Sequence, residues 1–212
     1  VPVLVDNDVN IMALGEHRKS WRETQHLLYV KVGTGIGCGI VSSGQIHRGA
    51  EGAAGDIGHI VVPDRQEVCR CGNVGCLEAV AGGRALAMRL NAEDNSAADS
   101  RDVIRLVREG NAAAIRMVRE AGRTIGEVLA ACVNFFNPGV IVIGGDMAEV
   151  HEQLLAGLRE VIFQRSLPLA TRDLRIVPSQ LDDGAGVVGA AIMVVEHLLA
   201  PEAIDRALRA SA

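Results

Sequence analysis

The sequence predicts an α/β domain with a mixed sheet. Short β-branched or apolar runs alternate with segments in which apolar residues recur every three or four positions, as in α/β proteins. The run 140–143 is apolar throughout, as expected of a strand that is buried on both faces of a sheet. The 212 residues are 49% hydrophobic, which is enough for a sizeable core.

The first elements surround a polar turn and a glycine-rich turn. We expect a strand at 3–5, then a polar cluster at 6–10 that leads into a helix with apolar positions at Ile11 and Leu14. Asp8 would then lie at a strand-to-helix turn. The runs 26–32 and 39–41 flank the glycine string 33–37, which predicts a β-hairpin with a glycine-rich tip.

The rest of the chain divides into a loop, several helices and two strands. Residues 47–76 contain three cysteines and little periodicity, so we expect an irregular loop that needs a metal for support. Helical patterns cover the ranges 77–90, 101–108, 112–136, 149–163 and 186–199, with a polar linker at 91–100. Asn137 and Pro138 end the longest helix, and strands are expected at 140–143 and 174–177.

Charge and hydropathy exclude two classes of partner. The formal net charge is -5 and the basic residues are scattered, so these residues are not expected to bind DNA. No apolar run approaches the roughly 20 residues that cross a bilayer, and no basic-then-apolar leader is present, so we expect no membrane partner and a cytoplasmic location. Because the sequence starts at Val1, we expect a piece of a longer protein.

Three of the five cysteines are clustered, together with a histidine, in a pattern typical of a structural zinc site. The predicted ligands lie within 18 residues: His59, Cys69, Cys71 and Cys76. Glycines between the last two thiols allow the sharp turn that such a site needs. Three reduced cysteines beside an ordinary core histidine are the alternative. A catalytic zinc is disfavoured because four protein ligands leave no open position.

Four motifs follow one another along the chain: Asn-Asp-Val-Asn at 7–10, Gly-Thr-Gly-Ile-Gly at 33–37, Gly-Asp-Ile-Gly-His at 55–59 and Cys-Arg-Cys-Gly-Asn-Val-Gly-Cys-Leu-Glu at 69–78. In type and order they resemble the motifs of ROK proteins. The whole chain, 1–212, resembles the C-terminal lobe of this family of sugar kinases and sugar-responsive repressors. The resemblance implies an actin-like ATPase (ribonuclease-H-like) fold, with a zinc-binding loop at 55–78. It also implies that the N-terminal lobe and any DNA-binding domain would lie outside this sequence.

The resemblance also implies roles for individual residues. Asp8 matches the general base of the kinases, which takes the proton of the attacking sugar hydroxyl. Sugar hydroxyls would be bound by Asn7, Asp8, Asp56, His59 and Glu78, and His59 would give its other ring nitrogen to zinc. A phosphate or nucleotide would lie against Gly33, Thr34, Gly35, Gly37, Gly144 and Gly145.

Each assignment has a structural alternative. Asp8 could cap the helix that follows it, and Glu78 could be an exposed first-turn residue favoured by the helix dipole. The glycine string could be an ordinary hairpin tip, and Gly144 and Gly145 could allow a strand and a helix to pack closely.

One departure from the kinase pattern guides the functional prediction. The kinases usually have glutamate where this chain has Asp56. The shorter aspartate side chain at this position resembles the repressor-type members of the family. We therefore expect the sugar-sensing part of a transcriptional regulator that binds DNA only through an absent N-terminal domain, and the resemblance implies a homodimer. The alternatives are a glucokinase-like hexose kinase that uses ATP and Mg²⁺, or a zinc-stapled oligomerisation domain. The fragment alone is expected to be inactive.

Overall fold

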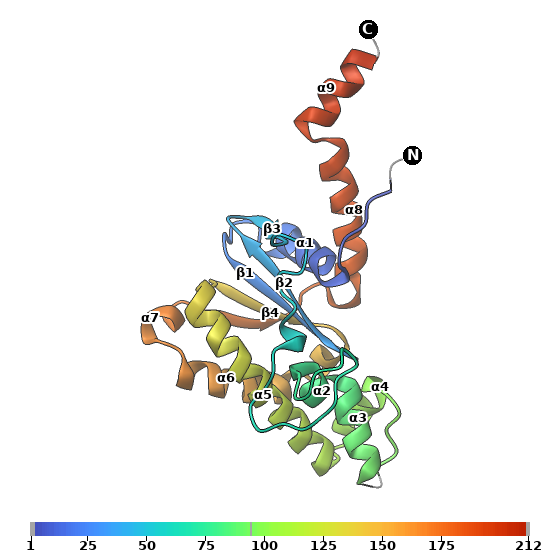
Figure 1. Ribbon diagram of the computed structural model, residues 1–212, viewed down its shortest axis with the longest axis vertical. Helices are drawn as coiled ribbons and strands as arrows, with labels where there is room; N and C mark the ends of the chain where they lie inside the picture. Colours follow the sequence, from blue (N-terminus) through green and yellow to red (C-terminus); the bar gives the residue numbers. More distant parts are fainter. Residues whose placement is uncertain (1–2, 94, 211–212) are drawn as a thin grey trace.

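A mixed sheet organises the computed structural model, which describes residues 3–93 and 95–210 (Figure 1). Within these residues the strand order is β3-β2-β1-β4-β5. The strands are β1 (Leu27–Val32), β2 (Ile36–Ser42), β3 (Gln45–His47), β4 (Val140–Gly144) and β5 (Arg175–Pro178). β1 pairs antiparallel with β2 and parallel with β4, and β5 is parallel to β4. The predicted mixed α/β sheet is therefore confirmed.

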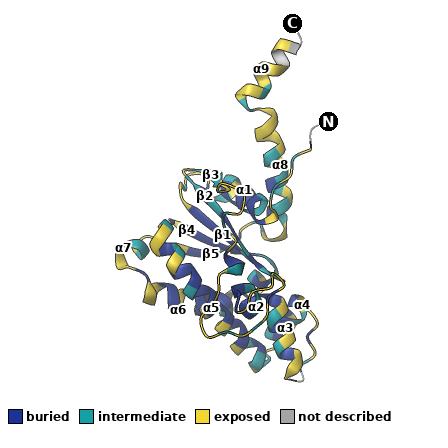
Figure 2. Cartoon of the chain, viewed as in Figure 1, coloured by how far each residue is buried: buried dark blue, intermediate teal, exposed yellow. Residues whose placement is uncertain are grey.

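Helices cover both faces of this sheet. They are α1 (Asp8–Ser20), α2 (Leu77–Ala81), α3 (Gly83–Ala92), α4 (Ser100–Arg108), α5 (Ala112–Phe136), α6 (His151–Arg165), α7 (Pro168–Thr171), α8 (Ala185–Leu198) and α9 (Pro201–Ala210). Successive β1 side chains point to opposite faces, so Leu28 and Val30 join the core on the α5 and α6 side. Leu27 and Tyr29 join a smaller cluster that contains residues of α1 and the start of α8 (Figure 2).

Glycines allow two helix pairs to approach closely. A Cβ atom on Gly122 of α5 would collide with the backbone carbonyl of Leu154 on α6, and one on Gly15 of α1 would collide with that of Ala185 on α8. Bare backbone at these points therefore sets the spacing of both pairs.

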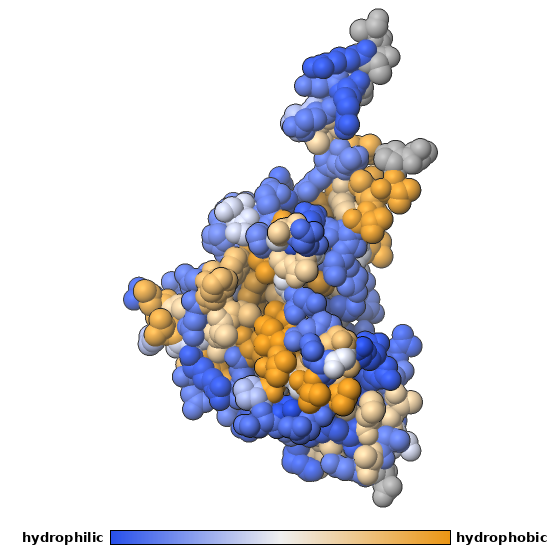
Figure 3. Space-filling view, in the orientation of Figure 1, coloured by the Kyte–Doolittle hydropathy of each residue, from blue (hydrophilic) through white to orange (hydrophobic). Residues whose placement is uncertain are grey.

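Helix α8 also presents apolar side chains to solvent. Val187, Val195 and Leu198 are exposed, and Figure 3 shows apolar side chains gathered over this helix. Large exposed apolar patches are typical of contact surfaces. In the described part of the chain, no helix is long and apolar enough to cross a membrane.

The structure corrects several predicted elements. Residues 3–5 do not form a strand: Val3 and Val5 are 85% and 89% exposed and pair with no strand. The helix predicted at 77–90 is interrupted at Gly82, because the next two backbone N–H groups bond to the tip of the β1–β2 hairpin. The helix expected to begin at 149 is preceded by a 3-10 turn, Asp146–Val150, and α9 was not predicted. The linker 91–100 is not wholly exposed, since Ala97 and Ser100 are buried.

Candidate functional site

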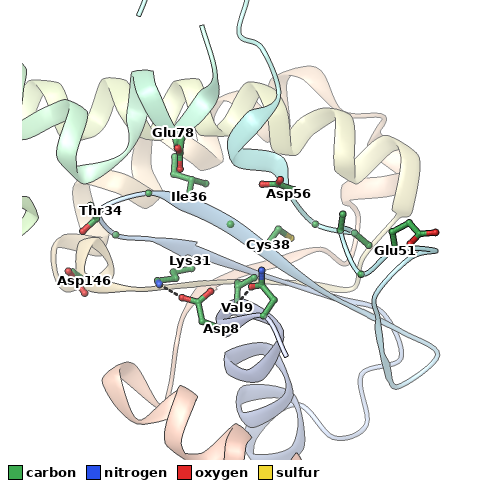
Figure 4. A pocket seen from close by; sticks show the side chains of 18 residues that line it. Asp8, Val9, Lys31, Thr34, Ile36, Cys38, Glu51, Asp56, Glu78 and Asp146 are labelled. Carbon is green, nitrogen blue, oxygen red and sulfur yellow. Dashed lines mark hydrogen bonds and ion pairs between the residues drawn. The ribbon is translucent and has the colours of Figure 1, made fainter. Parts of the chain in front are cut away.

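A cavity of about 530 Å³ lies between the N-terminus of α1, the β1–β2 hairpin and the loop that follows β3 (Figure 4). Of the predicted site residues, it gathers Asn7, Asp8, Gly33, Thr34, Gly35, Gly37, Asp56 and Glu78. His59, Gly144 and Gly145 are not among its lining residues. Segments that are far apart in the sequence therefore meet around one space.

Asn7 and Asp8 have different roles at the start of α1. The Asn7 side chain is the N-cap, since its Oδ1 accepts a hydrogen bond from the Val9 N–H at 3.0 Å. The alternative in which Asp8 caps the helix is thus wrong. Asp8 is instead largely exposed in the cavity, and its Oδ2 lies 2.6 Å from the Lys31 Nζ. Its carboxylate is available to a ligand beside that ammonium group.

The glycine-rich tip of the β1–β2 hairpin is held by the α2–α3 junction. The Gly83 N–H donates to the Gly33 carbonyl at 2.7 Å, and the Arg84 N–H donates to the Thr34 carbonyl at 3.3 Å. A Cβ atom at Gly35 would lie 2.6 Å from the Glu78 Oε2. Glycine at this position therefore lets the Glu78 carboxylate lie against the tip.

Four side chains in the loop 55–78 form a group that could hold a metal ion. The ligand atoms of His59, Cys69, Cys71 and Cys76 all lie within 4.8 Å of one another. The Cys71 Sγ lies 3.6 Å from the Cys76 Sγ, and the Cys69 Sγ lies 3.6 Å from the His59 Nδ1. Such spacings fit four donors around one tetrahedral ion, and three sulfurs with one imidazole are a donor set that zinc accepts.

The turns of the loop and the positions of the other two cysteines are consistent with a ligand group made of these four side chains. Gly72 and Gly75 have positive φ angles of 94° and 77°, which glycine adopts without strain and which turn the loop between the last two thiols. Cys38 and Cys132 lie outside the group. Burial raises the pKa of both of these thiols, so neither is a ready nucleophile.

The metal-ligand group is adjacent to two cavity carboxylates. The His59 Nε2 lies 4.0 Å from the Asp56 Oδ1, and the Cys69 Sγ lies 3.5 Å from the Glu78 Oε1. The segment before Asp56 is fixed to β2, because the Cys38 N–H donates to the Gly55 carbonyl at 2.9 Å. An ion held by the loop would therefore stabilise the positions of Asp56 and Glu78.

Gly144 and Gly145 have clear packing roles. A Cβ atom on Gly144 would collide with the Tyr29 hydroxyl, and one on Gly145 would lie 2.7 Å from the Val32 carbonyl. Their role in nucleotide binding stays a prediction.

Sequence reasoning missed three charged residues that line the cavity: Lys31, Glu51 and Asp146. Lys31 gave a usable signal, since it is the one charged residue in an otherwise apolar strand and stands two positions before the glycine string. Asp146 lies close to Ser100, whose hydroxyl donates to its Oδ2 at 3.1 Å. No local pattern pointed to Glu51.

Comparison with known proteins agrees with the predicted fold. A crystal structure of a ROK family transcriptional regulator, a homolog of the E. coli MLC protein, has a TM-score of 0.82 and 30% identity, and the match covers 90% of this chain and 51% of that one. A ROK family glucokinase from Streptomyces griseus, in complex with glucose and AMPPNP, has a TM-score of 0.79 and 31% identity, with 91% and 68% covered. These similarities confirm the actin-like ATPase fold.

Sequence comparison gives the same assignment. A putative xylose repressor from Caldicellulosiruptor sp. (strain Rt8B.4) is 35% identical, over 94% of this chain and 54% of the repressor. The chain thus spans about half the length of this relative. The ROK family matches residues 1–197. That match includes every residue that lines the cavity and all four possible metal ligands, and the chain belongs to the ROK family.

Proposed function

We propose that these residues are the sugar-binding, effector-sensing part of a ROK-type transcriptional regulator. The observation that carries the proposal is the convergence of Asn7, Asp8, Asp56 and Glu78 on one cavity beside the metal-ligand group. Carboxylate oxygens accept hydrogen bonds from sugar hydroxyls, and the Asn7 amide can donate as well as accept. Repressors are among the relatives, and the longer protein would carry the DNA-binding function.

We also propose that the metal is a structural zinc ion. One imidazole and three thiolates form a closed ligand set, so zinc would fix the loop and leave no position for a catalytic water. Its contribution to sugar binding would be indirect, through the placement of Asp56 and Glu78. Chelation of the ion from the full-length protein should weaken sugar binding, and readdition of zinc should restore it.

The direct test is calorimetry on the full-length protein with D-xylose, D-glucose and N-acetyl-D-glucosamine. At least one sugar should bind, and Asp8→Asn should weaken its binding about tenfold or more, because a charged hydrogen-bond acceptor is lost. Asp64→Asn is a suitable control, since Asp64 is exposed and does not line the cavity. Sugar should also change the affinity for operator DNA. A protein that binds none of these sugars would refute the proposal.

An ATP-dependent hexose kinase is the second candidate. The observation that favours it is the position of Asp8 in the same cavity as the glycine-rich tip, where a sugar hydroxyl and a phosphate could meet. Similarity to a glucokinase adds support. ADP formation that requires hexose and is abolished in Asp8→Asn would favour this function over the regulator.

A further inference from the structure

Lys31 is unusual in both sequence and position. Of the 21 basic residues only two are lysines, Lys19 and Lys31. Lys31 is on β1, where its neighbours across the sheet are Gly37 of β2 and Gly144 of β4. Among the described residues it is the one cationic side chain that lines the cavity.

Glycines make room for this side chain. A Cβ atom at Gly145 would lie 3.1 Å from the Lys31 Cγ, and one at Gly33 would lie 3.9 Å from its Cε. The stem therefore passes between the hairpin tip and the end of β4, and the Nζ reaches the Asp8 Oδ2 at 2.6 Å (Figure 4). The Lys31 side chain is 33% exposed, so its ammonium group remains open to a ligand.

A sugar bound in this cavity needs hydrogen-bond donors as well as acceptors. The cavity carboxylates belong to Asp8, Glu51, Asp56, Glu78 and Asp146, and an ionised carboxylate only accepts hydrogen bonds. A sugar hydroxyl donates one hydrogen bond and also accepts. The Lys31 ammonium has three N–H groups, and its one hydrogen bond within the described residues is to Asp8. Two donors are therefore left for ligand oxygens.

We propose that Asp8 and Lys31 act together to recognise two neighbouring oxygens of the sugar. Asp8 accepts a hydrogen bond from one hydroxyl, and Lys31 donates to the adjacent oxygen. Lys31 is then a specificity-determining residue, and the ligand class is a sugar with free neighbouring oxygens. The inference rests on the proposed sugar-binding function. A compact ammonium suits this role, because a planar guanidinium would need more space between the two glycine segments.

The experiment uses the full-length protein and whichever of D-glucose, D-xylose and N-acetyl-D-glucosamine it binds. We expect Lys31→Met to weaken binding about tenfold or more, because methionine keeps an unbranched stem but has no N–H donor. Lys19→Met should change affinity less than about twofold, since Lys19 is exposed at the other end of α1. Lys31→Arg should restore only part of the loss.

Monodeoxy derivatives of the same sugar distinguish contact from positioning. If Lys31 contacts one oxygen, Lys31→Met and the wild-type protein should bind the derivative that lacks that oxygen equally well. For the remaining derivatives, the wild-type protein should still bind more tightly than Lys31→Met.

Three outcomes are decisive. If the wild-type protein binds none of the three sugars, the proposed function itself fails. If it binds sugar but Lys31→Met behaves like Lys19→Met, only the role of Lys31 fails. If Lys31→Met weakens the binding of every deoxy derivative by the same factor, Lys31 only orients Asp8, and the inferred contact is overturned.

Discussion

The buried carboxylate of Glu16 on α1 allows the loss of stability in Glu16 variants to be predicted. This carboxylate is fully buried and accepts four hydrogen bonds, from the Ser179 hydroxyl at 2.7 Å, the Gln180 N–H at 2.9 Å, the Leu181 N–H at 3.3 Å and the Trp21 Nε1 at 3.3 Å. Three of these bonds join α1, which begins at the cavity, to the segment that follows β5, and the fourth holds Trp21 at the end of α1. Loss of Glu16 should therefore loosen that face of the sheet.

The expected cost follows from the two short bonds. Hydrogen bonds to a charged group contribute about 1.5–3 kcal/mol each, and bonds near 3.3 Å contribute less. We expect Glu16→Ala to lower the free energy of unfolding by about 3–5 kcal/mol, since it leaves several buried donors unpaired. Glu16→Gln keeps the shape but replaces one acceptor oxygen with NH₂, so a loss of about 2 kcal/mol is expected.

The assay is urea denaturation of the 212-residue chain followed by tryptophan fluorescence. Trp21 is the only tryptophan and donates to Glu16, so its emission reports on this region. Glu23→Gln, an exposed site two residues beyond Trp21, should stay within about 0.5 kcal/mol of the wild type. A Glu16→Ala variant that is as stable as this control would refute the assigned role of the buried carboxylate.

Three further predictions concern backbone packing and one buried hydroxyl. Gly55→Ala should destabilise the fold and weaken sugar binding, because the new Cβ would collide with a carbonyl of β2; Gly52→Ala, with a similar positive φ but open space, should show the smaller loss in a thermal melt. Gly122→Ala should cost about 3 kcal/mol or more in urea denaturation, since its Cβ would meet the Leu154 carbonyl. Tyr29→Phe should remain within about 1 kcal/mol of the wild type at neutral pH, because the hydroxyl has no hydrogen-bond partner in the described residues. Burial raises the pKa of Tyr29 to about 12, so the protonated hydroxyl stabilises the fold below pH 10, and this contribution is lost as the pH rises towards 12. Tyr29→Phe should therefore remove this fall in the free energy of unfolding between pH 10 and pH 12. If the variant and the wild type lose the same stability over this range, the assigned role of Tyr29 is wrong.

The metal-ligand group and the longest helix could be predicted because their signals are local. Cysteine and histidine spacing within 18 residues constrains the four ligands to one loop, and their atoms indeed lie within 4.8 Å of one another. The helix Ala112–Phe136 has the predicted bounds, since apolar spacing, the Asn111 cap and the turn at Asn137 all act within a few residues.

The contacts between segments that are far apart in the sequence depend on the sheet. Lys31 meets Asp8 across 23 positions, and Glu16 meets Ser179 across 163, so no local pattern could pair them. The interruption at Gly82 likewise follows from hydrogen bonds to the hairpin tip rather than from helix propensity alone. The sequence by itself therefore determined the family, the α/β class and the group of four side chains that could hold a metal. Only the tertiary structure decided which charges face one another in the cavity, because strand order and helix packing bring together residues that are far apart along the chain.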